Sequence, residues 1–355
     1  MEKVKKPLVS VLILTYNRTD LLKMCLDSAL KSNYPNLEFI ISDNESSDDI
    51  KGFIKKNYSD DRIKVVRLKK NKGLTGGFNF GFKFCKGKYV MLLCNDTKID
   101  RKGISEMVKL TEADPQIGMV APLVTQMRDP TYIHSAGSFL TNTGILYHYG
   151  VYQNKKNSKY KKYFYIFSST GAGFLVRRET IFKTDLYSED FFMAYDESDL
   201  CHRVWLGGYT IVFCPKAELQ HYWSATMDSN QPILWYWNHR NILSSFLVNF
   251  STFNLLRFVF TISMIWAFVF FHRLYKKKLR LALTIPQAYW WHMLNFKKTM
   301  IRRAYVQKNV RKISDSEIFE RAMILPDFDY YLLYFGKKSK DIKLPKKIIY
   351  QRLSR

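Results

Sequence analysis

The residues LVSVLILTYN (8–17) form an apolar, β-branched run that ends abruptly in polar side chains. The same pattern returns in LEFIISDN (37–44) and in YVMLLCND (89–96). Continuous apolar runs of this length are typical of strands that are buried on both faces of a parallel sheet. The sequence therefore predicts three buried strands, each followed by polar residues at its carboxyl end.

Segments with the spacing of helices separate these runs, and further strands follow. We expect helices at 19–31, 48–57 and 101–112 and additional strands at 62–68 and 117–122. Strands that alternate with helices of about 10–15 residues indicate the α/β class, with a mostly parallel sheet covered by helices on both faces. In such sheets ligands bind beyond the carboxyl ends of the strands. The polar residues at these ends are therefore candidates for a binding site: Thr15, Tyr16, Asn17, Asp43, Asn95 and Asp96.

The two carboxylates of this set, Asp43 and Asp96, each allow more than one interpretation. Asp43 could accept hydrogen bonds from a base or a ribose, but Asp, Asn and Ser also cap helices. Both can hold if Asp43 meets a ligand while Ser46 or Ser47 caps the next helix. Asp96 could hold Mg²⁺ or Mn²⁺ against a diphosphate, or it could simply form a turn.

A glycine-rich stretch, NKGLTGGFNFG (71–81), follows the third predicted strand. Its spacing fits neither the dinucleotide GxGxxG motif nor a Walker loop. Glycines allow the backbone to approach a ligand closely, so Gly73, Gly76, Gly77 and Gly81 could form a phosphate loop. A flexible turn leading to an apolar-faced segment that ends near Cys85 is the competing interpretation.

The second half of the predicted domain contains a cluster of acids and a lone histidine. In FFMAYDESDLCHR (191–203), Asp196, Glu197 and Asp199 stand together before a predicted helix. Like charges near a buried surface raise each other's pKa, as a general base requires, although acids are also common at helix starts. His221 ends the second of two short predicted strands and is either structural or a ligand.

Composition points to an anionic partner. The chain of 355 residues has 47% hydrophobic residues, enough for a packed core, and a formal net charge of +25. Such a charge favours nucleic acid, an anionic membrane or phosphorylated substrates as partners. The five scattered cysteines include no CxxC pair, which is typical of reduced thiols in a cytosolic protein.

The C-terminal third differs in character from the rest of the chain. Between Asp228 and Asp315 there is no acidic residue, but there are 14 Lys and Arg and the apolar run at 258–271. That run would span about 21 Å as a helix, which is short of a bilayer core. Aromatic and cationic residues together suit the headgroup zone of an anionic membrane. We therefore expect an interfacial or buried helix, with a dimer interface or a cover on the first domain as the alternative.

Seven motifs, in this order, resemble family 2 glycosyltransferases of the GT-A fold. They are VSVLILTYNR, IISDNESSDD, NKGLTGGFNFGFK, KYVMLLCNDT, GAGFLVRRE, FFMAYDESDLCHRVWLGGYTIVFCP and QHYWSAT. The resemblance covers about residues 7–245 and is greatest to the rhamnosyltransferase-like branch. It implies a catalytic domain at 1–228, with a nucleotide-binding half to about 122 and an acceptor half from 123, and a basic, helical, membrane-associating region at 229–355.

The resemblance also implies roles for individual residues. The nucleotide-sugar would contact the strand ends and the glycine-rich segment, through Thr15, Tyr16, Asn17, Asp43, Asn71, Gly73, Gly77 and Asn95. Asp96 matches the last carboxylate of the family's metal motif, Cys94 replaces the first, and His221 could complete the shell of Mg²⁺ or Mn²⁺. Glu197 would be the base, beside Asp196. Gly171, Gly173 and Asp199 would bind the acceptor.

The predicted function is inverting transfer of a hexosyl or rhamnosyl group from a UDP-, dTDP- or GDP-sugar. The acceptor would be a hydroxyl of a glycan or lipid-linked molecule, at the cytoplasmic face of the cell membrane, with the protein peripheral or monotopic. A scaffold in polysaccharide assembly stays open, because Cys94 stands in the metal motif. A nucleic-acid-binding protein is disfavoured, because no RNP, helix-turn-helix or zinc motif is found.

Overall fold

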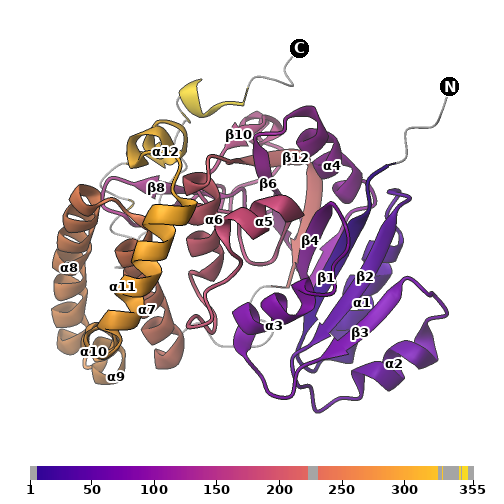
Figure 1. The fold of residues 1–355 in the computed structure, drawn as a ribbon, viewed down its shortest axis with the longest axis horizontal. Coiled ribbons are helices and arrows are strands. Elements are labelled where there is room, and N and C mark those ends of the chain that lie inside the picture. The colour runs from indigo at the N-terminus through magenta and orange to yellow at the C-terminus, as the bar shows by residue number, and fades with distance from the viewer. Residues whose placement is uncertain (1–5, 223–230, 327–329, 331–343, 345, 351–355) are drawn as a thin grey trace.

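The computed structural model describes residues 6–222, 231–326, 330, 344 and 346–350. At its centre is a ten-stranded sheet in the order β10-β12-β6-β11-β4-β1-β2-β3, with β5 paired to β12 and β7 to β6. The neighbours β3, β2, β1 and β4 are all parallel, while β11 runs antiparallel to both β4 and β6. The predicted mostly parallel sheet is therefore confirmed (Figure 1). The strands are β1 (Val9–Thr15), β2 (Leu37–Asp43), β3 (Ile63–Arg67), β4 (Tyr89–Cys94), β5 (Thr97–Ile99), β6 (Ile117–Gln126), β7 (Ile133–Ser135), β10 (Phe164–Tyr165), β11 (Gly173–Arg177) and β12 (Thr210–His221).

Helices cover the sheet on both faces, as the alternating pattern predicts. Two separate apolar clusters lie against it, because the side chains of each strand alternate between its two faces. In β1, Leu12 belongs to one cluster while Val11 and Ile13 belong to the other. The helices of this part are α1 (Thr19–Leu30), α2 (Ile50–Asn57), α3 (Gly73–Phe82), α4 (Gly103–Ala113), α5 (Arg178–Thr184) and α6 (Asp196–Leu206).

The glycine-rich stretch is not the flexible turn that its composition suggests. Gly73 begins α3, and the glycines that follow lie inside this helix. A Cβ atom on Gly77 would lie 2.2 Å from Leu14 Cδ1, and one on Gly81 would lie 2.5 Å from Leu12 Cδ1. Close packing of α3 on β1 thus requires glycine here and outweighs the poor helix propensity of this residue.

The two short strands expected around residues 209–221 are one strand. β12 pairs with β6 along its length, with a shift of register between Cys214 and Glu218. Pro215 lies in this irregular part, where it does not interrupt a regular ladder. A second small sheet is formed by β8 (Ser138–Thr141), β9 (Leu146–His148) and β13 (Met323–Ile324), the last of which comes from the C-terminal region. Short 3₁₀ turns occupy Ser158–Lys161 and Lys346–Ile348.

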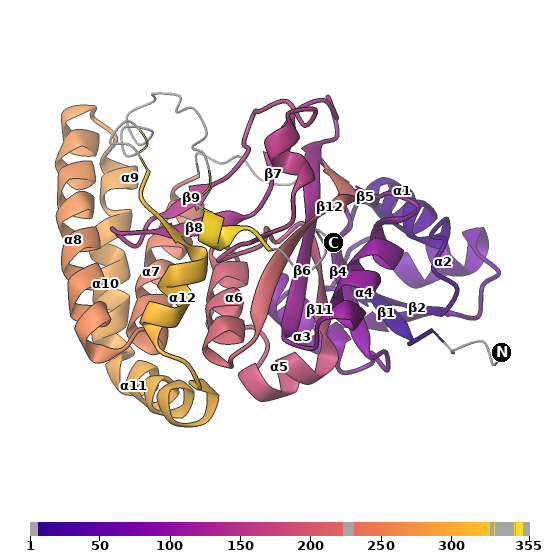
Figure 2. The same ribbon diagram turned by 90° about the horizontal axis from the view of Figure 1, so that it is seen from above.

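The C-terminal region is helical. Figures 1 and 2 show α8 at one outer edge of the molecule, on the side away from β3. The inner face of α8 packs into the same apolar cluster as β8 and α6, through Phe258, Ile262 and Trp266. The predicted boundary at 228/229 lies outside the described residues, and the regions on its two sides share a core. The helices are α7 (Pro232–Asn249), α8 (Thr252–Tyr275), α9 (Leu279–Ala282), α10 (Thr284–Leu294), α11 (Phe296–Tyr305), a π-helical turn (Val306–Val310) and α12 (Asp315–Ala322).

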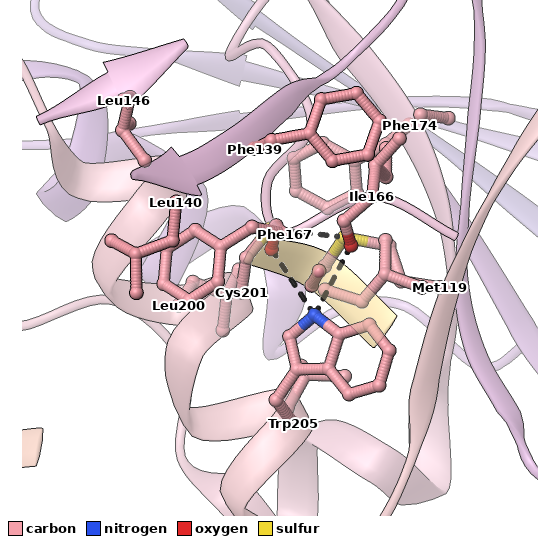
Figure 3. Close-up of a cluster of buried hydrophobic side chains, with 14 of the residues drawn as sticks. Met119, Phe139, Leu140, Leu146, Ile166, Phe167, Phe174, Leu200, Cys201 and Trp205 are labelled. Carbon is pink, nitrogen blue, oxygen red and sulfur yellow. Dashed lines mark hydrogen bonds between the residues drawn. The ribbon is translucent and has the colours of Figure 1, made fainter. Parts of the chain in front are cut away.

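Buried aromatic packing holds α6 against the small sheet. Trp205 is fully buried, and its indole Nε1 donates hydrogen bonds to the carbonyls of Ile166 and Phe167, at 3.1 and 3.3 Å (Figure 3). Phe139 and Leu200 lie in the same cluster. A buried indole N–H without such partners would be costly, so these bonds fix the position of the helix. The first turn of α6 carries Asp196 and Glu197.

Candidate active site

The polar ends of β1, β2 and β4 meet at one edge of the sheet. The parallel registers place Thr15 opposite Asp43 and Leu14 opposite Cys94. The Asn95 Nδ2 donates to Thr15 Oγ1 at 3.0 Å and to the carbonyl of Asn17 at 3.4 Å. Four of the predicted nucleotide contacts are thus brought together. Tyr16 lies beside them and is exposed.

Asp43 is buried and fully engaged by protein groups. Its Oδ1 accepts from the backbone N–H of Ser46 at 2.8 Å, and its Oδ2 pairs with the Arg67 guanidinium. The half-exposed Arg67 was not found from the sequence, since an arginine in a short strand carries no signal of its own. Neither Ser46 nor Ser47 caps α2. The side chain of Asp49 does so by accepting from Gly52 N at 2.9 Å.

The loop before α3 is built around two amides. The Asn44 Nδ2 donates to Asn71 Oδ1, and Asn71 Oδ1 also accepts from Gly73 N, at 2.9 and 2.8 Å. Gly73 has a φ of +69°, and a side chain there would collide with Phe192. Asn71 and Gly73 therefore lie beside the strand ends, as expected. Gly77 does not, because it faces β1 inside α3, and we withdraw it as a ligand contact.

Asp96 and His221 are neighbours, because β5 pairs antiparallel with the end of β12. The His221 Nε2 lies 3.4 Å from Asp96 Oδ2. On its other side, the Nδ1 of His221 lies 3.0 Å from the Nδ1 of His134. Burial lowers the pKa of His134 to about 3, so this imidazole is neutral at physiological pH. His134 had no signal in the sequence, because it stands alone in a loop-like stretch.

This pair fits a divalent cation in part. The Asp96 Oδ1 is buried without a hydrogen-bond partner, which leaves a carboxylate oxygen available as a ligand. Imidazole and carboxylate together suit Mn²⁺. Among the described residues no group of three or more His, Cys, Asp or Glu could hold a metal. The protein would thus supply two side chains, with a diphosphate and water as the remaining ligands.

The backbone before α6 is strained. Ala194 and Tyr195 have φ values of +71° and +59°, a conformation that costs free energy for residues with a side chain. The Asn241 Nδ2 of α7 donates to the carbonyls of Met193 and Ala194, at 2.9 and 2.7 Å. Asn241 therefore holds the turn that leads to Glu197. It lies in a helix 44 residues beyond that base and was not found from the sequence.

Desolvation of the partly buried Glu197 raises the pKa of its carboxyl to about 7, a value that would suit a general base near neutral pH. Burial and the charge of Glu197 also raise the pKa of Asp196 well above its usual value, and Asp196 Oδ2 has no hydrogen-bond partner. The Oε2 of Glu197 would lie 3.6 Å from a Cβ on Gly171. The carbonyl of Gly171 accepts from the Cys94 thiol at 3.3 Å, which connects the base to the end of β4.

Asp199 and Gly173 are not available to an acceptor. The Oδ2 of Asp199 accepts from the Arg203 guanidinium, and its Oδ1 accepts from Asn249 Nδ2 at 2.8 Å. These partners and Arg302 hold the pKa of Asp199 low despite its burial. Gly173 lies within β11, where a side chain would meet the carbonyl of Leu92. Both residues are turned into the packed interior, so we do not propose them as acceptor contacts.

A cavity of about 570 Å³ opens beside Glu197. Its walls come from the β8–β9 hairpin, the start of α6, and the helices α7 and α8, with Tyr195, Trp235 and Asn238 among the lining residues. This volume is within the range of small-molecule sites. Glu197 thus lines this cavity and, through Gly171 and Cys94, lies near the end of β4.

Comparison with known proteins identifies a family for the N-terminal half of the chain. Residues 10–182 match the family described as "Glycosyl transferase family 2". These residues form a glycosyltransferase family 2 domain. The matched range includes the strand-end residues and Asp96 but stops before Glu197 and His221. In the structure, the loop before α6 connects Glu197 to the family 2 domain, and β12 connects His221 to it.

Two relatives show the kinds of enzyme to which the family 2 domain is similar. The chain is 35% identical over 107 residues to the UDP-Glc:alpha-D-GlcNAc-diphosphoundecaprenol beta-1,3-glucosyltransferase WfaP of Escherichia coli, which is 30% of this chain and 42% of that enzyme. It is 34% identical over 115 residues to the poly-beta-1,6-N-acetyl-D-glucosamine synthase of Staphylococcus epidermidis, which is 32% of this chain and 27% of that enzyme. The matches thus span less than half of either relative.

Solved structures show that the fold is of the GT-A type. The chain superimposes with a TM-score of 0.54 on a mannosyltransferase from Pyrobaculum calidifontis in complex with GDP-Man and Mn²⁺, at 17% identity and covering 86% of each chain. It superimposes on TarS 1–349 of S. aureus with a TM-score of 0.51, at 16% identity and covering 71% of this chain and 70% of that one. At such identities the likeness concerns the fold alone.

Proposed function

We propose that this protein is an inverting glycosyltransferase that moves a sugar from a nucleoside-diphosphate sugar to a hydroxyl of a membrane-bound acceptor. The observation that carries the proposal is the position of Glu197. Its pKa of about 7 lets it be ionised yet basic near neutral pH, and it lines the cavity while lying near the end of β4. A scaffold protein would have no need for a base in that place.

The donor would occupy the edge where β1, β2 and β4 end. Thr15, Asn17 and Asn95 present hydroxyl and amide groups there, and Tyr16 has an exposed ring that could stack on a base. The remaining proposed contacts are Asp43, Asn71 and Gly73, which shape the loops around this edge. The half-exposed Arg67 adds a positive charge beside Asp43 that the sequence did not suggest.

The reaction follows from the position of the base. Glu197 takes the proton of an acceptor hydroxyl as that oxygen attacks the anomeric carbon. The bond between this carbon and the diphosphate breaks on the opposite face, so the anomeric centre inverts. Burial and the charge of Glu197 raise the pKa of Asp196 well above its usual value, which favours the protonated form of Asp196 and a single negative charge on the pair. Asp96 and His221 would hold a divalent cation, which when bound offsets the charge of the leaving diphosphate.

The outer face of α8 supports a position at the membrane. This helix has 24 residues and is about 36 Å long. By its length and composition alone, it could cross a bilayer. It is longer than the apolar run at 258–271, because the helix begins at Thr252 and ends at Tyr275. Its inner face is packed in protein while its outer face is exposed, as in helices that lie in an interface. The large exposed residues are Phe253, Leu256, Phe260, Met264, Phe268, Phe271 and Tyr275.

Positive charge accompanies this apolar face. The region from α7 to the π-helical turn contains Lys and Arg but no acidic residue, and it exposes Trp290 and Phe296. Anionic lipids attract such segments and aromatic rings settle at the headgroup level. We propose a peripheral or monotopic protein at the cytoplasmic face of the membrane, where nucleotide-sugars are present. Nucleic acid is not proposed as a partner.

The first test is release of nucleoside diphosphate from a panel of UDP-, GDP- and dTDP-sugars. The panel includes UDP-glucose, which the E. coli relative uses by its name, and dTDP-rhamnose, which the sequence motifs favour. A membrane extract supplies the acceptor, and each reaction is run with Mg²⁺, Mn²⁺ or EDTA. We expect turnover with one donor, loss of turnover with EDTA, and a product whose anomeric configuration is opposite to that of the donor, measured by NMR.

Two results would overturn the proposal. Retention of the anomeric configuration would remove Glu197 as the base of a single displacement. Absence of turnover together with absence of nucleotide binding, measured by calorimetry with UDP, GDP and dTDP, would favour the scaffold instead.

A further inference from the structure

The contact between His134 and His221 joins two strands that lie on opposite edges of β6. The short strand β7 pairs with one edge of β6, and the end of β12 pairs with the other. The two Nδ1 atoms are 3.0 Å apart, whereas the ring centroids are 4.9 Å apart and the ring planes differ by 28°. The rings therefore meet by their nitrogen edges, at the distance of a hydrogen bond.

A β-bulge directs His134 toward this contact. In the β6–β7 pair, Val124 is opposite Ser135 and Thr125 is opposite Ile133, so the register passes over His134. A bulge sets one residue outside the regular ladder and re-aims its side chain. Ile133 and Ser135 are buried, while His134 is partly exposed. The bulge therefore turns the ring of His134 away from the packed face that its two neighbours share.

The main chain is fixed on both sides of the contact. The backbone N–H of Ile133 donates to the carbonyl of Gln153 at 2.8 Å, and the carbonyl of Ile133 accepts from the N–H of Tyr152 at 2.9 Å. On the other side, the carbonyl of His221 accepts from the N–H of Met127 at 3.0 Å. The two strands thus hold both rings in place before any ligand binds.

A hydrogen bond between two neutral imidazoles has two possible arrangements. If the Nδ1 of His221 donates, the Nε2 of His221 carries a lone pair; if His134 donates, that Nε2 carries the hydrogen. The Nε2 of His221 lies 3.4 Å from Asp96 Oδ2, which exceeds the about 2.7–3.2 Å of an ordinary N–H···O hydrogen bond. The second arrangement therefore gains no good hydrogen bond to Asp96. The first presents a nitrogen lone pair and a carboxylate oxygen to the same space.

We infer that His134 is a positioning residue of the proposed metal site, because it accepts a hydrogen bond from His221 Nδ1 and so directs the lone pair of His221 Nε2 toward Asp96. This inference rests on the proposed function, in which Asp96 and His221 hold a divalent cation. A histidine ligand commonly donates its second ring N–H to a fixed acceptor, which orients the ring and strengthens metal binding. Here that acceptor is a second imidazole, which lies outside all the sequence motifs.

The first test measures the tautomer directly in the metal-free, full-length wild type. At pH 8, above the usual pKa of histidine, the ring-nitrogen shifts of protein labelled with ¹⁵N-histidine distinguish Nδ1–H from Nε2–H. His134→Asn and His221→Asn identify the two signals among the seven histidines. We expect the hydrogen on Nδ1 of His221 and on Nε2 of His134. A hydrogen on Nε2 of His221 in half or more of the molecules would overturn the inference.

The second test measures Mn²⁺ affinity by electron paramagnetic resonance, with UDP, GDP or dTDP present. His134→Phe keeps a flat ring that cannot accept a hydrogen bond. His134→Asn is the conservative variant, because its amide oxygen can accept from His221 near the place of the lost Nδ1. The matched control is His292→Phe in α10, which also removes a ring nitrogen at hydrogen-bond distance from its partner, 2.9 Å from the carbonyl of Arg240.

We expect His134→Phe to weaken Mn²⁺ binding about tenfold or more, as is usual for loss of the partner of a metal-binding histidine. His134→Asn should stay within about threefold of the wild type, and His292→Phe within about twofold. Equal loss in the Phe and Asn variants would mean that His134 only fills space and would overturn the inference. Wild-type affinity of His134→Phe would do the same. The tautomer measurement stands by itself if His134→Phe does not fold.

Electron spin echo spectra of the bound Mn²⁺ separate this inference from the proposed function. A coordinated imidazole nitrogen should be detected in the wild type and in His134→Asn, and not in His221→Asn. Absence of this nitrogen signal from the wild type, or failure of the wild type to bind Mn²⁺, would overturn the inference. Nucleotide binding and sugar transfer that persist in that case would leave the glycosyltransferase proposal intact. Absence of both would overturn the proposed function, whatever the tautomer of His221.

Discussion

The helices α1 and α8 both lie on an apolar core by one face, but their outer faces differ. On α1 the outer face is charged, with Lys23 and Asp27 joined in an ion pair of 2.7 Å. On α8 it is apolar, with Phe253 and Phe260 at 78% and 70% exposed. The same packing rule thus yields one helix whose outer face suits water and one whose outer face suits an apolar environment.

Glu197, the proposed base, lies where these two regions meet. The loop before α6 is bound from the sheet side by α3, through Thr75 to the carbonyl of Phe191 and through Asn79 to the carbonyl of Tyr187. From the helical side it is bound by α7, through Arg240 to the carbonyl of Asp190 at 2.8 Å. In the proposed function, a soluble donor from the sheet side and a membrane acceptor from the helical side would meet at Glu197. Substitutions on the sheet side and on the helical side of Glu197 should therefore have distinct effects.

The largest effect is expected at the meeting point itself. Glu197→Gln should lower kcat by about a thousandfold, within the range known for loss of a general base, and leave donor binding unchanged. The measurement is nucleotide release under saturating donor. Glu189→Gln, the same change at an exposed position of the same loop, is the control and should retain activity. A Glu197→Gln enzyme with more than a tenth of the wild-type rate would assign the base elsewhere.

On the donor side, Asp96→Asn should weaken metal-dependent donor binding by about a hundredfold. The buried Oδ1 of Asp96 has no other partner, so its replacement by an amide removes a ligand without releasing a hydrogen bond. The measurement is calorimetry of nucleotide binding with and without Mn²⁺. Asp61→Asn, at an exposed turn, should behave as the wild type. Equal response of both variants to Mn²⁺ would mean that the donor site works without this carboxylate.

The pH dependence of the rate tests the environment of the base. Glu197 accepts a proton only when ionised, and its pKa is raised to about 7. The rate should therefore fall about tenfold for each pH unit below 7 and level off above it. The folded state also holds this proton up to a higher pH than the unfolded chain, so stability should fall as pH rises from about 4.5 to 7. A Glu197→Gln protein should lack that fall, and a flat rate profile from pH 5 to 7 would contradict the assignment.

On the helical side, Phe253→Ser with Phe260→Ser should lower binding to vesicles with 30% phosphatidylglycerol by about tenfold or more. Each exposed ring would lose its transfer into the lipid, worth roughly 1.5–3 kcal/mol when complete. Flotation measures the bound fraction. The control is Phe182→Ser with Tyr152→Ser, which removes two exposed rings outside the helical region. Unchanged flotation of the α8 variant would show that this face meets a protein instead.

The smallest effect is expected at Asn241, which connects α7 to the turn before Glu197. Asn241→Ala removes two hydrogen bonds to the strained turn before Glu197 and should lower kcat by about tenfold with little change in the KM of the donor. Asn309→Ala, at an exposed position of the helical region, serves as the control. A change in the donor KM without a change in kcat would mean that Asn241 supports the fold of the donor site and does not position the base.

The local pattern of apolar and polar residues determined much of the fold of this protein. The apolar runs ending in Thr15, Asp43 and Asn95 became parallel strands with adjacent ends, because a buried strand needs little beyond continuous apolar residues. The pairing of Asp96 with His221 was expected from the resemblance, and the structure places them 3.4 Å apart. The roles assigned to these residues, and the boundary at 228/229, stay predictions.

Tertiary packing decided what local pattern left open. Gly77 was expected at a ligand and instead fits α3 against Leu14, while Asp199 was expected at an acceptor and instead pairs with Arg203 and Asn249. The cavity and the hold of Asn241 on the turn before Glu197 likewise join residues far apart in the chain. The physical reason is that apolar periodicity is written in neighbouring residues, whereas the partner of a buried polar group is fixed only when distant segments pack together.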